Sequence, residues 1–365
     1  MEENKMIINR LPMTTWNRLK VNQKTVELTN TLQEAPAGIT ISGSFSLRPT
    51  DTAFESIETG MGPGFDHFIS ENAPASLMYV VAPGTKNNTI TILIDYDAMP
   101  ELSDAAYVNA FRFFVSEGSD LTVLMDVRGT APVTGLTDVK ILAQANANVT
   151  LVQTKRLSEA VRYFGNAGTD FGEKSNFELV HVTFSGKEVN EGCTTKLSGD
   201  KSSARYDIGY LSGMESDIDQ SYLIRFTGKN TNGEIYSNGV LRGTTRKNFR
   251  GTIDFIRGCV GASGSEKEDV LLMDDTVVNL TSPLILCGEE DVEGEHGATL
   301  GRLAEEILFY LEARGVSEED AYKMVADGRM ASVIRHIPES QLRSELLSLV
   351  SEDEAIAGSK RRNSF

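Results

Sequence analysis

The sequence predicts a mainly β protein whose middle is a parallel β-helix, a solenoid built from stacked coils of short strands. Residues 75–292 are a succession of short runs rich in β-branched and aromatic residues, separated by Gly, Asn, Asp and Ser. Helical periodicity is rare there. Examples of these runs are LMYVV at 77–81, TITILIDY at 89–96, LTVLMDV at 121–127 and SPLILCG at 282–288.

A regular repeat separates a solenoid from other all-β folds. The segments FFVSEGSDLTVLMD and ILAQANANVTLVQT superpose with Val115 over Ala143 and Leu121 over Val149, so the two offsets are equal (143 − 115 and 149 − 121). A similar unit precedes them, and it superposes with Ile92 over Leu121 at an offset one larger (121 − 92). A β-sandwich is the alternative, but it needs hairpin turns, and Asn-Gly pairs occur at one place only. The constant period therefore favours the solenoid.

The regions on either side of the solenoid have a different texture. Residues 1–74 are expected to form an irregular or helical region, with a glycine-rich loop at 60–64. The solenoid is expected over 75–298 and a helical region over 299–356. The last residues, 357–365, are basic and are expected to form a disordered tail.

The helical region divides into several helices. The segment ATLGRLAEEILFYLEARG at 298–315 has apolar residues at helical spacing and ends in a glycine, which predicts a helix that stops there. Ser317 is a natural N-cap for a second helix, expected to end near Gly328. A further turn and a last helix over 339–350 complete the region.

Charge and apolar content argue against nucleic-acid and membrane partners. The 365 residues hold 35 Lys and Arg against 52 Asp and Glu, a formal net charge of −17, so nucleic acids and anionic membranes would be repelled. No run approaches the roughly 18 apolar residues of a membrane helix, and the first residues lack the apolar core of a secretory signal. We therefore expect a cytoplasmic protein.

The absence of several motifs narrows the chemistry. The chain has no G-x-x-x-x-G-K-[ST], so no nucleotide is expected in a P-loop, and it has no G-x-S-x-G and no H-E-x-x-H. Cys193, Cys259 and Cys287 are widely spaced and form no C-x-x-C pair. This spacing excludes a zinc knuckle and argues against a disulfide framework.

His296 differs from the other three histidines in its surroundings. Cys287 lies nine residues upstream of it, and five carboxylates precede it in the same stretch: Glu289, Glu290, Asp291, Glu293 and Glu295. Carboxylates beside an imidazole raise its pKa or share a metal with it. On the residues alone, a metal site and a solvated acidic turn both remain open.

The same stretch carries a resemblance to a known family. SPLILCGEEDVEGEHGATLGRL, followed by EEILFYLEARGVSEEDAYKMVADG, resembles the C-terminal signature of the SufB/SufD family of iron–sulfur cluster assembly proteins. The upstream FRGTIDFIRGCVGASGSEKEDVLLMDD and the opening LPMTTWNRLK fit the same family. The likeness covers the C-terminal third well and the middle through its strand texture.

The resemblance implies a fold, partners and a function. It implies a right-handed parallel β-helix between terminal helical regions, in a non-enzymatic scaffold that builds nascent iron–sulfur clusters together with the subunit SufB and the ATPase SufC. ATP hydrolysis would belong to SufC, and iron or a cluster would be held transiently and shared with SufB. The isolated chain could form a homodimer, and association with a flavin is left open.

Two departures favour a SufD-like subunit over a SufB-like one. Where SufB has a cysteine before a D-S-L-L-type strand, this chain has Glu268 in KEDVLLM, and E-H-G-A-T at 295–299 stands where SufB tends to read E-H-E-A-T. The resemblance implies cluster or iron contacts at four residues, with the first as the metal ligand: His296, Glu295, Cys287 and Glu268.

The resemblance also places SufC on the helices expected at 302–314 and 318–327. The candidate contacts are Leu308, Tyr310, Glu312, Arg314, Glu319 and Tyr322. An amphipathic stripe alone cannot separate docking from packing against the last coil. The remaining alternative, a β-helix carbohydrate-active enzyme, needs convergent acidic residues on neighbouring coils, and the sequence has no such ladder.

Overall fold

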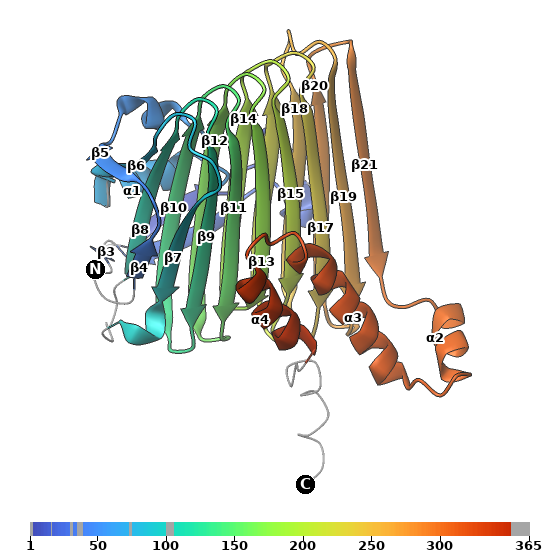
Figure 1. The fold of residues 1–365 in the computed structure, drawn as a ribbon. Coiled ribbons are helices and arrows are strands. Elements are labelled where there is room, and N and C mark those ends of the chain that lie inside the picture. The colour runs from blue at the N-terminus through green and yellow to red at the C-terminus, as the bar shows by residue number, and fades with distance from the viewer. Residues whose placement is uncertain are drawn as a thin grey trace.

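Two largely parallel β-sheets lie face to face through the middle of the chain (Figure 1). Successive strands alternate between the sheets, so that each coil gives one strand to each sheet, which confirms the predicted parallel β-helix. The expected tail at 357–365 lies outside the described residues. The computed structural model describes residues 3–15, 17–29, 32–34, 39–72, 75–99 and 106–351.

We call the sheet that contains β20 sheet I. Its order is β20-β18-β16-β14-β12-β10-β8-β6-β5; β5 is antiparallel to β6, and β3 also pairs with β8. Its strands are β3 (Leu32–Glu34), β5 (Ser46–Pro49), β6 (Leu77–Val81), β8 (Ala106–Val115), β10 (Val133–Ala143), β12 (Val161–Phe171), β14 (Glu188–Leu197), β16 (Asp217–Phe226), β18 (Arg246–Phe255) and β20 (Val278–Cys287).

Sheet II faces it. Its order is β21-β19-β17-β15-β13-β11-β9-β7-β4, with β4 antiparallel to β7. Its strands are β4 (Ile39–Ser42), β7 (Asn88–Asp95), β9 (Asp120–Gly129), β11 (Asn148–Leu157), β13 (Asn176–Ser185), β15 (Ser203–Leu211), β17 (Asn232–Leu241), β19 (Ala262–Leu272) and β21 (Val292–Gly301).

The register confirms the predicted period and corrects it at the first coil. Ala143 pairs with Val115, and Val149 pairs with Leu121, as predicted. Ile92, however, pairs with Met125 and not with Leu121, so the offset there is larger (125 − 92). This coil is longer because the connection from β7 to β8 holds extra residues, which include the short 3₁₀ helix η3 (Tyr96–Ala98).

A left-handed backbone conformation recurs at one corner of the coils. Its N–H groups donate to carbonyls at the same corner of the next coil, as Asn146 does to Glu173 at 2.8 Å and Lys174 to Asp200 at 2.9 Å. These turns stack in register because each leaves its donor aligned with the coil axis. The residues with positive φ at this corner are Gly84, Gly118, Asn146, Lys174, Lys201, Asn230 and Gly261.

The space between the sheets is filled by rows of apolar side chains that stack from coil to coil. The rings of Phe171 and Phe177 stack with their centroids 5.0 Å apart. The rows are interrupted by a fully buried ion pair between Lys155 and Glu191, 2.5 Å apart. Gln220 donates a further hydrogen bond of 2.9 Å to Glu191. A buried pair is tolerated only with such extra partners, because desolvation of the two charges is costly.

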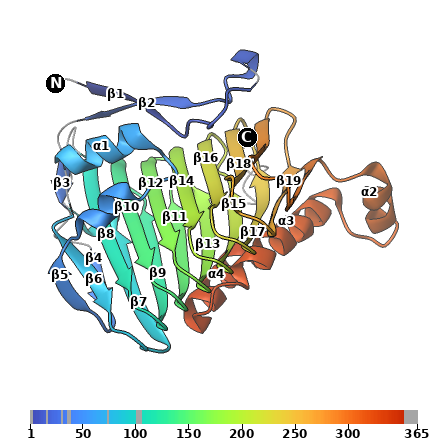
Figure 2. The ribbon, with the colours of Figure 1, turned by 90° about the horizontal axis from the view of Figure 1, so that it is seen from above.

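The N-terminal residues cross the outer face of sheet I (Figure 2). β1 (Glu3–Ile8) and β2 (Lys24–Thr29) form an antiparallel hairpin, followed along the chain by the short 3₁₀ helix η2 (Thr52–Ser56) and the helix α1 (Pro63–Asn72); η1 (Asn17–Leu19) lies in the hairpin loop. Apolar residues of the hairpin and of α1 pack together on the strands beneath, and the cluster includes Met6, Ile8, Val26, Leu28, Phe65, Phe68, Val108, Leu136 and Phe164.

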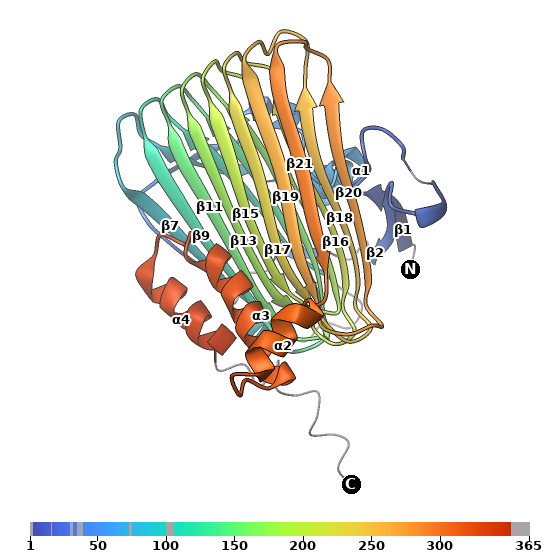
Figure 3. The same cartoon turned by 90° about the vertical axis from the view of Figure 1, so that its right-hand side faces the viewer.

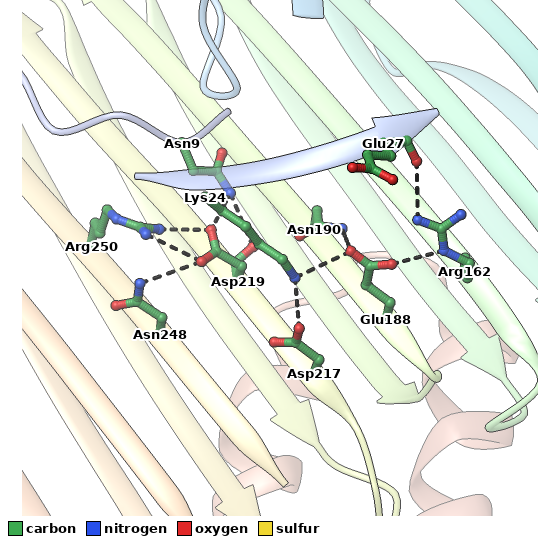
Figure 4. Close-up of polar contacts among 10 residues, drawn as sticks. All are labelled: Asn9, Lys24, Glu27, Arg162, Glu188, Asn190, Asp217, Asp219, Asn248 and Arg250. Carbon is green, nitrogen blue, oxygen red and sulfur yellow. Dashed lines mark hydrogen bonds and ion pairs between the residues drawn. The ribbon is translucent and has the colours of Figure 1, made fainter. Parts of the chain in front are cut away.

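Polar contacts fasten the same hairpin further along sheet I (Figure 4). Arg250 donates to both carboxylate oxygens of Asp219, at 2.7 and 3.2 Å, and also to the carbonyl of Val21. Asn9 donates to the same carboxylate at 2.7 Å. Lys24 reaches Asp217 at 2.9 Å. Because Arg250 is fully buried, its charge depends on this carboxylate.

Up to residue 351, where the described chain ends, three helices follow β21: α2 (Glu305–Glu312), α3 (Glu318–Ile334) and α4 (Ser340–Ser351). α3 lies on the outer face of sheet II against β13, β15 and β17. The Ser317 hydroxyl accepts from the Asp320 N–H, so the predicted N-cap is confirmed. The predicted end near Gly328 is wrong, because α3 runs on to Ile334, where apolar packing on sheet II outweighs the helix-weakening effect of one glycine.

Candidate functional site

The last coil, β20 and β21, forms an open end of the solenoid. In the described part of the chain, no strand pairs with the outer edge of either (Figure 3). The backbone groups on these edges are therefore free to bond to a further strand. The inner face of β21 lacks a covering coil as well, and most of its residues are exposed.

Glycine contacts establish which face of β21 points inward. A Cβ added to Gly294 would meet Ile285 and Phe255 side chains of the core at 3.3 Å. Because alternate residues of a strand share a face, His296 points inward as Gly294 does, and Glu295 points to the outer face. The sequence predicted contacts from both residues, but the structure places them on opposite faces of the sheet.

Glu268 also points inward but is fully engaged in a buried network. Its carboxylate pairs with the ammonium of Lys247, and neither side chain is exposed. Tyr210 donates to the same carboxylate at 3.1 Å and Thr281 at 2.7 Å. Burial lowers the pKa of Lys247 although the charge of Glu268 opposes that shift. Glu268 is therefore not available as a ligand, since releasing it from Lys247 would leave a buried cation unpaired.

Glu266 is a second inward carboxyl at this end, and sequence reasoning missed it. It is 2% exposed, and neither of its oxygens has a hydrogen-bond partner among the described residues. Desolvation, followed by the charge of Glu268, raises its pKa to about 8 against the opposing charge of Lys247. Its side chain lies over Gly251, where a Cβ would come within 2.7 Å of its Cγ. The alternation E-K-E at 266–268 was the available signal, because residues two apart on a strand share a face.

Glu266 and His296 are register partners on adjacent parallel strands. Paired residues of neighbouring strands lie about 4.8 Å apart and point to the same face. The imidazole and the free carboxyl therefore lie on the same face of neighbouring strands. The imidazole is exposed and the carboxyl is buried. This pair is the main chemical feature of the open end.

Cys287 lies away from that pair. Two contacts show which part of β20 lies opposite His296. Thr281 contacts Glu268, which pairs with Ala298, and Ile285 lies against Gly294. His296 is halfway between Gly294 and Ala298, so it lies opposite the point of β20 midway between Thr281 and Ile285. Cys287 is four residues beyond that point, about 13 Å along the strand. Its exposed thiol donates to the Glu289 carbonyl at 3.0 Å. Cys193 and Cys259 are buried, and all three are free.

The candidate partner contacts on the helices divide into exposed and packed residues. Tyr310, with the Arg314 guanidinium 3.7 Å from its ring centroid, is exposed, as are Glu312 and Glu319. Tyr322 is buried and accepts from Arg302 at 3.0 Å. Leu308 is partly buried against the apolar side chains that α3 and α4 pack on sheet II. The most exposed apolar side chain of α2 is Phe309, which the sequence did not single out, at 75%.

Two further properties of the described residues bear on ligands. They contain no group of three or more His, Cys, Asp and Glu side chains placed to hold a metal ion. None of their helices is both long and apolar enough to span a membrane.

Comparison with known proteins identifies the family. Residues 100–329 match the description "SUF system FeS cluster assembly, SufBD core domain". Because this match covers more than half of the chain, the protein belongs to the SufB/SufD family of iron–sulfur cluster assembly proteins, and the resemblance seen in the sequence is confirmed.

Comparison with individual relatives places the chain nearer to SufD than to SufB. The iron–sulfur cluster assembly protein SufD of Bacillus subtilis is 25% identical over 256 residues, which are 68% of this chain and 58% of that protein. SufB of the same organism is 31% identical over 128 residues, 35% of this chain and 28% of that protein. A SufBD family protein of Mycobacterium tuberculosis is 36% identical over 128 residues, 35% of this chain and 15% of that protein. The chain is SufD-like, and it spans 58% or less of the length of these relatives.

Proposed function

We propose that the chain is the SufD-type subunit of a non-enzymatic scaffold in which a SufB-type subunit shares the nascent cluster and a SufC-type ATPase supplies the ATP hydrolysis. The observation that carries the proposal is His296 on the open end, beside two unpaired strand edges of the described chain. A partner whose own edge strands continue the sheets would bring its ligands to this histidine. Iron and sulfide are cargo in this scheme, and their site is shared between the subunits.

The chemistry of the site fits a shared arrangement. An imidazole and carboxylates suit ferrous iron, whereas sulfide-bridged clusters are held mainly by thiolates. Cys287 is about 13 Å along the strand from the level of His296, and Cys193 and Cys259 are buried. We therefore assign thiolate ligands to the partner and an iron-contacting role to His296. A cytoplasmic location is part of the proposal.

The experiment is anaerobic reconstitution of the complex with SufB- and SufC-type partners. His296→Ala should leave folding and complex assembly intact, because the side chain is exposed, yet lower the iron and acid-labile sulfide recovered. His67→Ala, which changes an exposed histidine on α1, is the matched control. Wild-type iron and sulfide in the His296 variant would remove this residue from the proposed role.

We assign the docking surface for SufC to α2 and the first turn of α3. Phe309, Tyr310 and Ile307 are exposed apolar side chains on a helix that has no buried residue. Phe309→Asp should weaken co-purification with SufC, as should charge reversal at Glu312 and Glu319. Leu349→Asp on α4 is the control, since it replaces an apolar side chain that is exposed on a different helix. Undiminished binding by the Phe309 variant would refute this surface.

A further inference from the structure

We propose that Glu266 and His296 together form this chain's half of a binding site for a divalent cation of the ferrous type. The inference deepens the proposed function, because it names the ligand pair that would receive iron at the open end. It also replaces two residues that the sequence favoured, since Glu295 points to the other face and Glu268 is held by Lys247.

Glu266 and His296 lie next to each other on neighbouring strands. The two residues are Cα partners on β19 and β21 and share the inward face. Both oxygens of Glu266 lack a partner among the described residues although the residue is 2% exposed. A buried polar group without a partner costs free energy, and such groups in native proteins call for an explanation. A cation held between this carboxyl and the imidazole would satisfy both.

Packing around Glu266 holds its carboxyl in place without giving it a hydrogen-bond partner in the described part of the chain. The glycine at 251 leaves the room that the Glu266 side chain fills, so the carboxyl is held beneath the open end. Lys247, the nearby cation, is paired with Glu268. Tyr210 and Thr281 complete that network from the sides. The network positions one carboxylate and leaves the neighbouring carboxyl free for a ligand.

The open end of the solenoid is surrounded by carboxylates. Glu293 and Glu295 lie on the outer face of β21, and the turn before it adds Glu289, Glu290 and Asp291. A concentration of negative charge raises the local concentration of cations. Carboxylate with imidazole is a ligand set that suits Fe²⁺, and the uncovered side of the site leaves positions for water or for a partner's ligands. The pair is therefore a half-site that a second subunit completes.

The test measures cation binding by the isolated full-length chain, without cluster formation. Co²⁺, a redox-stable substitute for Fe²⁺, is titrated by calorimetry and by its visible absorption, and Fe²⁺ is titrated anaerobically. Wild type should bind one ion per chain. Glu266→Gln and His296→Ala should each weaken binding about tenfold or more, as expected when one of a few metal-site partners is lost. Glu295→Gln and Cys287→Ser should stay within about twofold.

Circular dichroism and thermal unfolding establish that each variant is folded, and His296→Ala guards against a loss of fold because its side chain is exposed. Absence of stoichiometric binding by wild type, or equal affinity in Glu266→Gln, would overturn the inference. Equal affinity combined with lost reconstitution in the His296→Ala complex would overturn it while the proposed function stands. Weakened binding combined with undiminished reconstitution would support the cation site and count against the proposed role of His296.

Discussion

Replacing Glu266 by glutamine should stabilise the protein increasingly as the pH rises. The native carboxyl keeps its proton to about pH 8, whereas the ordinary pKa of such a group is 4.5. Between these values the unfolded chain ionises and the folded chain does not. The contribution of this carboxyl to stability is therefore complete below pH 4.5 and lost as the pH rises to 8.

The magnitude follows from the two pKa values. At about 1.4 kcal/mol per pH unit, wild type should lose about 3 kcal/mol relative to Glu266→Gln by pH 7 and about 4 kcal/mol by pH 8, where half of the native carboxyls are ionised. The Lys247–Glu268 pair is present in both proteins, and its charges act on the carboxyl of Glu266 in wild type only.

The assay is urea unfolding followed by circular dichroism at pH 5, 6, 7 and 8, without added metal. Urea is uncharged and leaves the electrostatics in place. The two proteins should differ by about 1 kcal/mol at pH 5, and the difference should grow steadily up to pH 8. Parallel stabilities over the whole range would show that Glu266 is ionised or solvated in the native state, which would refute the reasoning.

Four further substitutions test the packing and the α3 cap. Asp219→Ala should cost about 3–5 kcal/mol, because it leaves buried Arg250 unpaired, whereas Asp217→Ala, whose side chain is 46% exposed, should cost at most about 1 kcal/mol; equal losses in chemical denaturation would contradict this. Gly251→Ala should cost about 1–3 kcal/mol, because the new Cβ would come within 2.7 Å of Glu266 Cγ, and an unchanged unfolding midpoint would show that the site has slack. Ser317→Ala should lower stability by about 1 kcal/mol through loss of the α3 cap, and hydrogen exchange in the first turn of α3 should rise if the cap matters.

Several local features could be predicted because neighbouring residues determine them. The period of the coils follows from the repeat of apolar runs and turns, and the pairs Val115–Ala143 and Leu121–Val149 have the predicted register. The Ser317 cap depends on four consecutive residues. Family membership could also be inferred, because the residues from Ser282 onwards are a contiguous stretch that resembles the family, and the match over residues 100–329 confirms it.

Only the tertiary structure decided which distant side chains meet. Asn9 reaches Asp219 across 210 positions of sequence, and no local pattern encodes that contact. The sequence contained the carboxyls of Glu266, Glu268 and Glu295, but it could not tell which one is free beside His296. That depends on strand alternation, on register and on where Lys247 falls in the preceding coil. Chemistry at the open end is thus set by packing between coils, because a single residue of register moves a side chain from one face of the sheet to the other.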